Sequence, residues 1–379
     1  MDQMMEKTAF LYAGQGSQKP GMGMDFYREY ETYRNFADRM FAAYPVFSAD
    51  FSALAADKES GKKAADAAAN RKPGESAADL SVSDAESRGN IPAADAKNEE
   101  HALAADLRKI MEEGPADVLS RTEYTQVCMG IFAAGVTQLL EEQGIRPDAA
   151  CGLSLGEYGA LYAAGAFSAE DYVRLLAFRG RAMAKAAEGT DTAMTAVMGA
   201  LEESRLREIC REFQDGFITA ANFNCPGQTV LCGDSETLSQ VEKRLKEISG
   251  VRCIRLKVSG PFHTEYMASA GEALASYFAN SNLTVQPLRI PVAANATGTF
   301  YAPEEDVTEL LVKQVQSSVF LEQDLRALIG AGYRNFIEIG PGKTMAGFLK
   351  KTAKAMGEEV RVQSIDSVED FRNAAFGRK

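Results

Sequence analysis

The residues best suited to do chemistry form the pentapeptide Gly152-Leu153-Ser154-Leu155-Gly156. A serine between two glycines suits a sharp turn from a strand into a helix, which exposes its hydroxyl as a nucleophile. An apolar stretch precedes this motif and a helical pattern follows it, as such a turn requires. The backbone N–H of Leu155, at the start of the helix, is then placed to stabilise an oxyanion. The alternative is a chance pentapeptide, since glycine and serine are common.

A serine nucleophile needs a base, because its hydroxyl is hardly ionised at pH 7. The chain has only two histidines, His101 and His263. His101 ends a segment poor in large apolar residues, so we expect it to be solvated. His263 lies in a loop before a predicted helix, and we predict that it is the base. A lone histidine is more often structural, and the group that orients this one is not evident from the pattern.

Two arginines follow on the next predicted helix, Arg179 and Arg181. An arginine directed into the site would pair with a substrate carboxylate through two parallel hydrogen bonds. Most arginines are merely solvated, and spacing alone does not decide between these two.

Two nucleotide-binding patterns fail on inspection. The Gly-rich segment 14–18 lacks the third glycine of a dinucleotide fingerprint, and Gly342-Lys343-Thr344 has Ile337 where a P-loop needs its first glycine. The predicted C-terminal helix is locally basic, either as a solvated face or as a docking surface for an acidic partner. Its lysines are Lys343, Lys350, Lys351 and Lys354.

The composition is that of an ordinary globular protein, with 379 residues, 46% hydrophobic and 25% charged. A formal charge of −12 argues against a nucleic-acid partner. No run of 18 apolar residues is present, and acidic residues stand where a secretory signal needs basic ones, so we expect neither a membrane span nor export. Six scattered cysteines without a C-x-x-C pair indicate reduced cytoplasmic thiols and no metal site.

Residues 53–102 stand apart, with 15 alanines and no aromatic residue. Such a segment cannot bury enough apolar surface to offset its ordering entropy, and we predict a surface insertion away from the serine. Elsewhere short apolar stretches alternate with helical patterns, which predicts a parallel sheet covered on both faces. The predicted strands are 8–13, 148–152, 290–294 and 335–339. The predicted helices are 127–142, 155–164, 169–186 and 263–279, more than one within 307–330, and one at the C-terminus.

The middle of the chain has another rhythm. Four predicted strands (192–198, 217–222, 229–232 and 251–258) and two helices (202–213 and 235–248) follow the order β-α-β-β-α-β. This is the split unit of a ferredoxin-like fold, and its length suits a small inserted subdomain.

Seven motifs occur in an order that resembles the malonyl-CoA:acyl carrier protein transacylases of bacterial fatty acid synthesis. The resemblance covers nearly the whole chain except residues 53–102. The motifs are GQGSQ at 14–18, GLSLGEY at 152–158, Arg179, NFNCPGQ at 222–228, GPFH at 260–263, LVKQ at 311–314 and EIGPGK at 338–343.

This resemblance implies an α/β fold, with an α/β-hydrolase-like large subdomain and an inserted ferredoxin-like small one. The implied large subdomain comprises 1–190 and 260–379, and the small one 191–259. The implied activity is ping-pong transfer of malonyl from malonyl-CoA to the phosphopantetheine thiol of acyl carrier protein. The enzyme would act as a monomer and need no cofactor beyond its coenzyme A substrate.

The resemblance also implies roles for individual residues. Ser154 would be the acylated nucleophile, His263 its base, and Arg179 the partner of the malonyl carboxylate. The backbone N–H of Gln15 would join that of Leu155 in the oxyanion hole.

Two more positions follow from the resemblance. The main-chain carbonyl of Gln314 would orient the histidine, and the bulky Phe262 would exclude methylmalonyl. The chain departs from the family at Leu153, where a histidine is usual, so that a local hydrogen bond must be absent or replaced. The alternatives are a free-standing acyltransferase of a polyketide synthase, a serine esterase or thioesterase, and a non-catalytic carrier-binding protein.

Overall fold

The computed structural model describes residues 7–44, 107–213, 215–258 and 260–376. The predicted insertion at 53–102, and His101 within it, lie outside these ranges. Within them, no helix is both long and apolar enough to cross a membrane.

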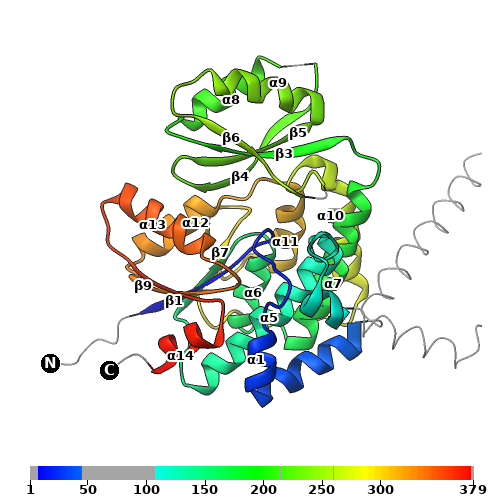
Figure 1. Cartoon of the computed structure of the whole chain (residues 1–379), viewed down its shortest axis with the longest axis vertical. Coiled ribbons are helices and arrows are strands. Elements are labelled where there is room, and N and C mark those ends of the chain that lie inside the picture. The colour runs from blue at the N-terminus through cyan, green and yellow to red at the C-terminus, as the bar shows by residue number, and fades with distance from the viewer. Residues whose placement is uncertain (1–6, 45–106, 214, 259, 377–379) are drawn as a thin grey trace, which may run out of the picture.

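A parallel sheet of four strands lies at the centre of the larger part of the molecule, in the order β10-β9-β1-β2 (Figure 1). Its strands are β1 (Thr8–Tyr12), β2 (Ala149–Gly152), β9 (Asn335–Ile339) and β10 (Arg361–Ile365). Strands β1, β2 and β9 agree with the sequence prediction. Strand β10 was not predicted, because it is an edge strand whose polar, half-exposed sequence lacks an apolar run.

Alternate residues of β1 supply two hydrophobic cores, one on each face of the sheet. Phe10 and Tyr12 belong to the larger core, which α5 (Thr122–Glu142), α7 (Ala169–Ala187) and further helices cover. Ala9 and Leu11 belong to the second core, against α12 (Leu321–Gly330) and α13 (Thr344–Met356). The other helices of this part are α1 (Met24–Glu29), α4 (Ala116–Leu119), α6 (Leu155–Ala163), α10 (Ala268–Asn280), α11 (Val307–Gln316), α14 (Val368–Phe376) and the helical residues 31–44 and 107–113.

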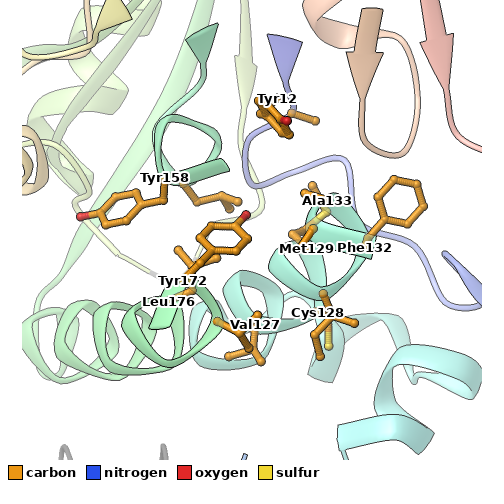
Figure 2. Packing of buried hydrophobic residues seen from close by; sticks show 14 of the residues in the cluster. Tyr12, Val127, Cys128, Met129, Phe132, Ala133, Tyr158, Tyr172 and Leu176 are labelled. Carbon is orange, nitrogen blue, oxygen red and sulfur yellow. The ribbon is translucent and has the colours of Figure 1, made fainter. Parts of the chain in front are cut away.

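Helices α5 and α7 pack closely in the larger core. Figure 2 shows Tyr172 and Leu176 of α7 beside α5, near Val127. A Cβ built on Gly130 of α5 would lie 2.5 Å from a methyl carbon of Leu176, so the glycine allows this approach. This packing matters for the site because α7 carries Arg179.

The second sheet is antiparallel, with the order β4-β5-β3-β6. Its strands are β3 (Thr192–Met198), β4 (Ile218–Cys225), β5 (Gln228–Asp234) and β6 (Arg252–Arg255), and its helices are α8 (Glu203–Arg211) and α9 (Ser235–Lys246). Both helices lie on one side of the sheet (Figure 1). The chain order and the spatial order are those of a ferredoxin-like unit, so the predicted two-part α/β fold class is confirmed. We propose residues 191–259 as the small subdomain, because all four strands lie in that range.

Two predicted elements need correction. The strand predicted at 290–294 is only the two-residue β7 (Ala293–Ala294), paired with β8 (Thr299–Phe300). The helix predicted from His263 begins at Ala268, after a short 3₁₀ turn. The helices predicted within 307–330 are α11 and α12. They are separate because the backbone of Val319 bonds to β4: its N–H donates to Ala221 and its carbonyl accepts from Phe223.

Candidate active site

Ser154 lies in the turn between β2 and α6 with φ 56° and ψ −105°. A positive φ is unfavourable for a residue with a side chain, and such a conformation stores about 1–3 kcal/mol. The neighbouring glycines make the turn possible. A Cβ on Gly152 would lie 2.0 Å from the carbonyl carbon of Gly156, and one on Gly156 would lie 2.2 Å from the carbonyl oxygen of Tyr12. The sequence therefore forces the serine into a turn where its half-buried hydroxyl leaves the sheet.

The two residues expected to form the oxyanion hole follow adjacent strands. Strands β1 and β2 pair in parallel with Tyr12 opposite Gly152. Gln15 lies three residues after Tyr12, and Leu155 three residues after Gly152, so both loops leave the same edge of the sheet. They are in close contact, because a Cβ on Gly14 would lie 2.7 Å from the carbonyl oxygen of Leu153. Leu155 begins α6, and the first N–H groups of a helix have no acceptor within it.

His263 contacts Ser154 directly. Its Nε2 lies 2.7 Å from the Ser154 Oγ, and its Nδ1 lies 2.8 Å from the main-chain oxygen of Gln314. A carbonyl only accepts hydrogen bonds, so Nδ1 carries the proton and Nε2 presents its lone pair to the serine. Gln314 is near the C-terminal end of α11, where main-chain carbonyls lack helical partners, and its carbonyl is free to accept.

The His263 ring is held neutral. Burial lowers the pKa of His263 to about 4, the positive charge of Arg179 adds to this shift, and the hydrogen bond to Gln314 opposes it. The side chain is only 4% exposed, so water cannot compensate a charged imidazole there. At neutral pH the ring is therefore an unprotonated base.

Arg179 is the predicted arginine that the fold brings to the serine. One terminal nitrogen of its guanidinium donates to the Ser154 Oγ at 3.0 Å, and the other donates to the Gln126 Oε1 at 2.7 Å. Arg179 is 1% exposed, and its guanidinium carbon lies 5.0 Å from the centroid of the Tyr158 ring. Among the described residues no carboxylate lies within ion-pair distance of it, and its Nε has no hydrogen-bond partner.

Arg181 instead lies over the ring of Tyr44, 5.9 Å from its centroid. The half-turn between the two arginines on α7 explains this outcome. Arg179 is on the face of α7 that packs toward the turn at residues 152–156, which we call the elbow. Arg181 is on the opposite, half-exposed face.

Three further polar residues of the site were missed by the sequence analysis, namely Gln126, Glu157 and Asn295. Asn295 accepts the Ser154 N–H at 2.7 Å through Oδ1, and its Nδ2 donates to the carbonyl of Gly152 at 2.8 Å. It thereby holds the backbone of the elbow on both sides. The available signal was a polar residue within an otherwise apolar, core-facing segment, which describes all three.

The remaining predicted residues lie as follows. The Gln15 side chain accepts from Thr122 at 3.0 Å, and Phe262 is buried next to the histidine. Leu153 packs against the second hydrophobic core, so this apolar contact stands where the family histidine would make a hydrogen bond. The four lysines of the basic C-terminal segment are exposed, which both a solvated face and a docking surface for an acidic partner require.

Comparisons with known proteins agree with this geometry. A family model described as acyl transferase domain matches residues 9–372. A malonyl CoA-acyl carrier protein transacylase of Bacillus subtilis (strain 168) is 32% identical over 366 residues, 96% of each chain. One of Staphylococcus aureus (strain MRSA252) is 32% identical over 72% of this chain and 86% of its own. The solved malonyl CoA-acyl carrier protein transacylase from Clostridium perfringens is 28% identical with a TM-score of 0.74, covering 97% of this chain and 96% of that one. The chain belongs to the acyl transferase family, among the malonyl CoA-acyl carrier protein transacylases.

Proposed function

We propose that this protein transfers the malonyl group from malonyl-CoA to the phosphopantetheine thiol of acyl carrier protein, for fatty acid synthesis. The observation that carries the proposal is a buried arginine, without a carboxylate partner among the described residues, 3.0 Å from the hydroxyl of the candidate nucleophile. In a malonyl thioester a single methylene separates the reacting carbonyl from the carboxylate. A carboxylate bound to Arg179 therefore places the thioester carbonyl next to Ser154.

The first half-reaction forms a malonyl-serine ester. His263 Nε2 takes the proton from the Ser154 hydroxyl while the oxygen attacks the thioester carbon. The N–H groups of Leu155 and Gln15 stabilise the tetrahedral oxyanion. The C–S bond then breaks, and the coenzyme A thiolate leaves with the proton from His263.

The second half-reaction returns the serine. The phosphopantetheine thiol gives its proton to His263 and its sulfur attacks the ester carbonyl. The serine oxygen leaves and recovers the proton. Burial of Arg179 and His263 supports this sequence, because water must compete poorly with the thiol if the ester is to be transferred rather than hydrolysed.

Intact-mass spectrometry after brief incubation with malonyl-CoA tests the proposal. We expect the native chain to gain one malonyl group and to lose it when acyl carrier protein is added. Steady release of coenzyme A without an adduct would instead indicate a hydrolase. Absence of both would refute the proposed substrate.

The Arg179→Ala substitution separates a transacylase from an esterase. Loss of a buried charged partner costs about 2–5 kcal/mol, so we expect kcat/KM for malonyl-CoA to fall about 30- to 5,000-fold. The rate of malonyl-CoA hydrolysis should not increase. The kcat/KM for acetyl-CoA, which lacks the carboxylate, should fall much less than that for malonyl-CoA. Arg181→Ala is the matched control on the same helix, and steady-state kinetics with both thioesters is the measurement. Retention of malonyl transfer by Arg179→Ala would contradict the assignment.

Phe262 is proposed to exclude branched substrates, since its bulk lies beside the base. One extra methyl group on a substrate changes the ratio of kcat/KM values by about 10- to 200-fold. We expect the kcat/KM of the native protein for malonyl-CoA to exceed that for methylmalonyl-CoA by a factor in this range. Phe262→Ala should narrow the preference, whereas Phe278→Ala on α10 should not. Competition between the two thioesters measures it. A faster native rate with methylmalonyl-CoA would overturn the proposal.

The proposed partners are malonyl-CoA and an acyl carrier protein, with neither a cofactor beyond coenzyme A nor nucleic acid. We propose a monomer acting in the cytoplasm, and all six cysteines are free thiols, which supports a reducing compartment. A free-standing acyltransferase for polyketide carriers would use the same chemistry. Relative rates with the two classes of carrier protein distinguish the pathways.

A further inference from the structure

The side-chain amide of Gln314 lies between three groups of the site. Its Oε1 accepts from the Arg179 guanidinium at 3.0 Å. Its Nε2 donates to the main-chain oxygen of Ser154 at 2.9 Å and to Glu157 Oε2 at 2.8 Å. The residue has no exposed surface, so no water competes for these bonds. These contacts are additional to the main-chain bond with His263.

The orientation of this amide is determined by its neighbours. A guanidinium only donates hydrogen bonds, and an ionised carboxylate only accepts them. Besides the hydrogen bond from Gln314, the Glu157 carboxylate accepts one from the Tyr301 hydroxyl and one from the Asn295 N–H, the latter at 3.1 Å. Burial raises the pKa of Glu157, whereas these three hydrogen bonds and the charge of Arg179 oppose that shift. Gln314, Tyr301 and Asn295 all donate to the carboxylate, so a flipped Gln314 amide would face it with its own oxygen in place of a donor.

The amide is one of two donors that fix the direction of the Leu155 N–H. The carbonyl of Ser154 and the N–H of Leu155 belong to one planar peptide and point in opposite directions. Hydrogen bonds from Gln314 Nε2, at 2.9 Å, and from the Glu157 N–H, at 3.1 Å, hold that carbonyl on the buried side. The N–H must then point away from it, toward the side of the elbow where an oxyanion forms.

The same amide holds the arginine. With Nε2 directed at Glu157, Oε1 faces Arg179, so the buried cation is linked to a buried anion through one side chain. The arginine terminal nitrogen that Gln314 accepts from is also the one that reaches Ser154 Oγ. The position of the cation relative to the nucleophile is therefore set by this contact together with the Gln126 bond to the other terminal nitrogen.

We propose that the side chain of Gln314, oriented by Glu157, is a positioning group that aligns the Leu155 N–H and the Arg179 guanidinium together. The inference rests on the proposed function, since it assigns these two groups to the oxyanion and the substrate carboxylate. It predicts two separable defects when the amide is removed or reversed. Misalignment of the oxyanion donor lowers kcat, and misplacement of the cation raises KM for malonyl-CoA.

The experiment compares Gln314→Met, Glu157→Met and the double variant with native protein. Methionine keeps the main-chain carbonyl and much of the volume but has no amide. The Glu157→Met substitution removes the carboxylate that accepts from Gln314 Nε2, so the amide loses one of the contacts that orient it. For each single variant we expect kcat to fall about 10- to 100-fold, somewhat less than complete loss of an oxyanion donor, and KM to rise several-fold. Gln316→Met, on the same helix, is the matched control and should match native kinetics.

The double variant decides whether the two residues act through one amide. If they do, it is no slower than the worse single variant, because groups that share one contact are not additive. A purely structural role would reduce the fraction of protein that can be acylated and leave KM unchanged. That result, or multiplying effects in the double variant, would overturn the inference.

Two further controls separate the possible failures. Circular dichroism and thermal melting identify a variant that does not fold, and if Glu157→Met is unfolded, the kcat and KM of Gln314→Met decide alone. Unchanged kinetics of that variant would overturn the inference while leaving the proposed function intact. A native protein that takes no malonyl group would refute both.

Discussion

Ser154→Ala is expected to gain no mass after incubation with malonyl-CoA and to lose on the order of 10⁶-fold in kcat. The expected loss is this large because the hydroxyl oxygen forms the covalent bond, and nothing else at the elbow replaces it. His263 and Arg179 both direct polar atoms at this oxygen, at 2.7 and 3.0 Å. Intact mass and carrier-loading rates measure the outcome.

Ser154→Gly is the matched variant, because it removes the same hydroxyl and accepts a positive φ without strain. It should be equally inactive and melt no lower than Ser154→Ala. An inactive alanine variant is then not explained by loss of the turn. A malonyl adduct on Ser154→Ala would show that another residue is acylated.

His263→Ala is expected to lower kcat by about 10⁴- to 10⁶-fold, since the serine hydroxyl then has no base. The described part of the chain offers no second imidazole, and Arg179 next to the oxygen is always protonated and cannot accept a proton. Single-turnover acylation rates, measured by rapid quench and intact mass, report the step directly. A variant that is acylated within tenfold of the native rate would remove His263 from the mechanism.

The pH dependence provides an independent check of this role. The base must be neutral to accept the proton, and its pKa is lowered to about 4 from the usual value near 6.5. In the native protein kcat/KM should therefore stay constant as the pH falls through 6.5 and should decline only near pH 4. The same shift makes the folded state bind fewer protons than the unfolded chain between these values, so stability falls as the pH is lowered across this window. Circular dichroism at each pH distinguishes loss of fold from titration of the base, and an acid limb near 6.5 would contradict a buried neutral histidine.

Much of the architecture could be predicted because it depends on local periodicity. The split β-α-β-β-α-β order, the strand Asn335–Ile339 and the helices on either side of the elbow all follow from apolar patterns within one segment. The nucleophile was predictable for the same reason, since its glycines and its strand–helix context lie within a few residues. His263 followed from the scarcity of histidine, and its assigned partner Gln314 only from the family resemblance.

Other features depend on contacts between segments far apart in the chain. Spacing left Arg179 and Arg181 equivalent, and the packing of α7 on α5 places only Arg179 at the serine. Asn295 is 141 residues from the backbone N–H that it accepts, and Gln314 is 160 residues from the carbonyl to which it donates. No periodicity reports such pairs, because each residue in isolation is only a polar side chain in an apolar segment.

By itself, the sequence determined most of the elements, the nucleophile and the two-part α/β architecture, because backbone preferences and apolar periodicity act over short distances. The tertiary structure decided which amide aligns the arginine and where the edge strand β10 pairs, and it gave the physical reason why Arg179, which only the family resemblance had singled out, reaches the serine. The physical reason is that a buried polar group is shielded from water and must form its hydrogen bonds within the protein. The packed positions of the helices determine which groups lie close enough to form those bonds.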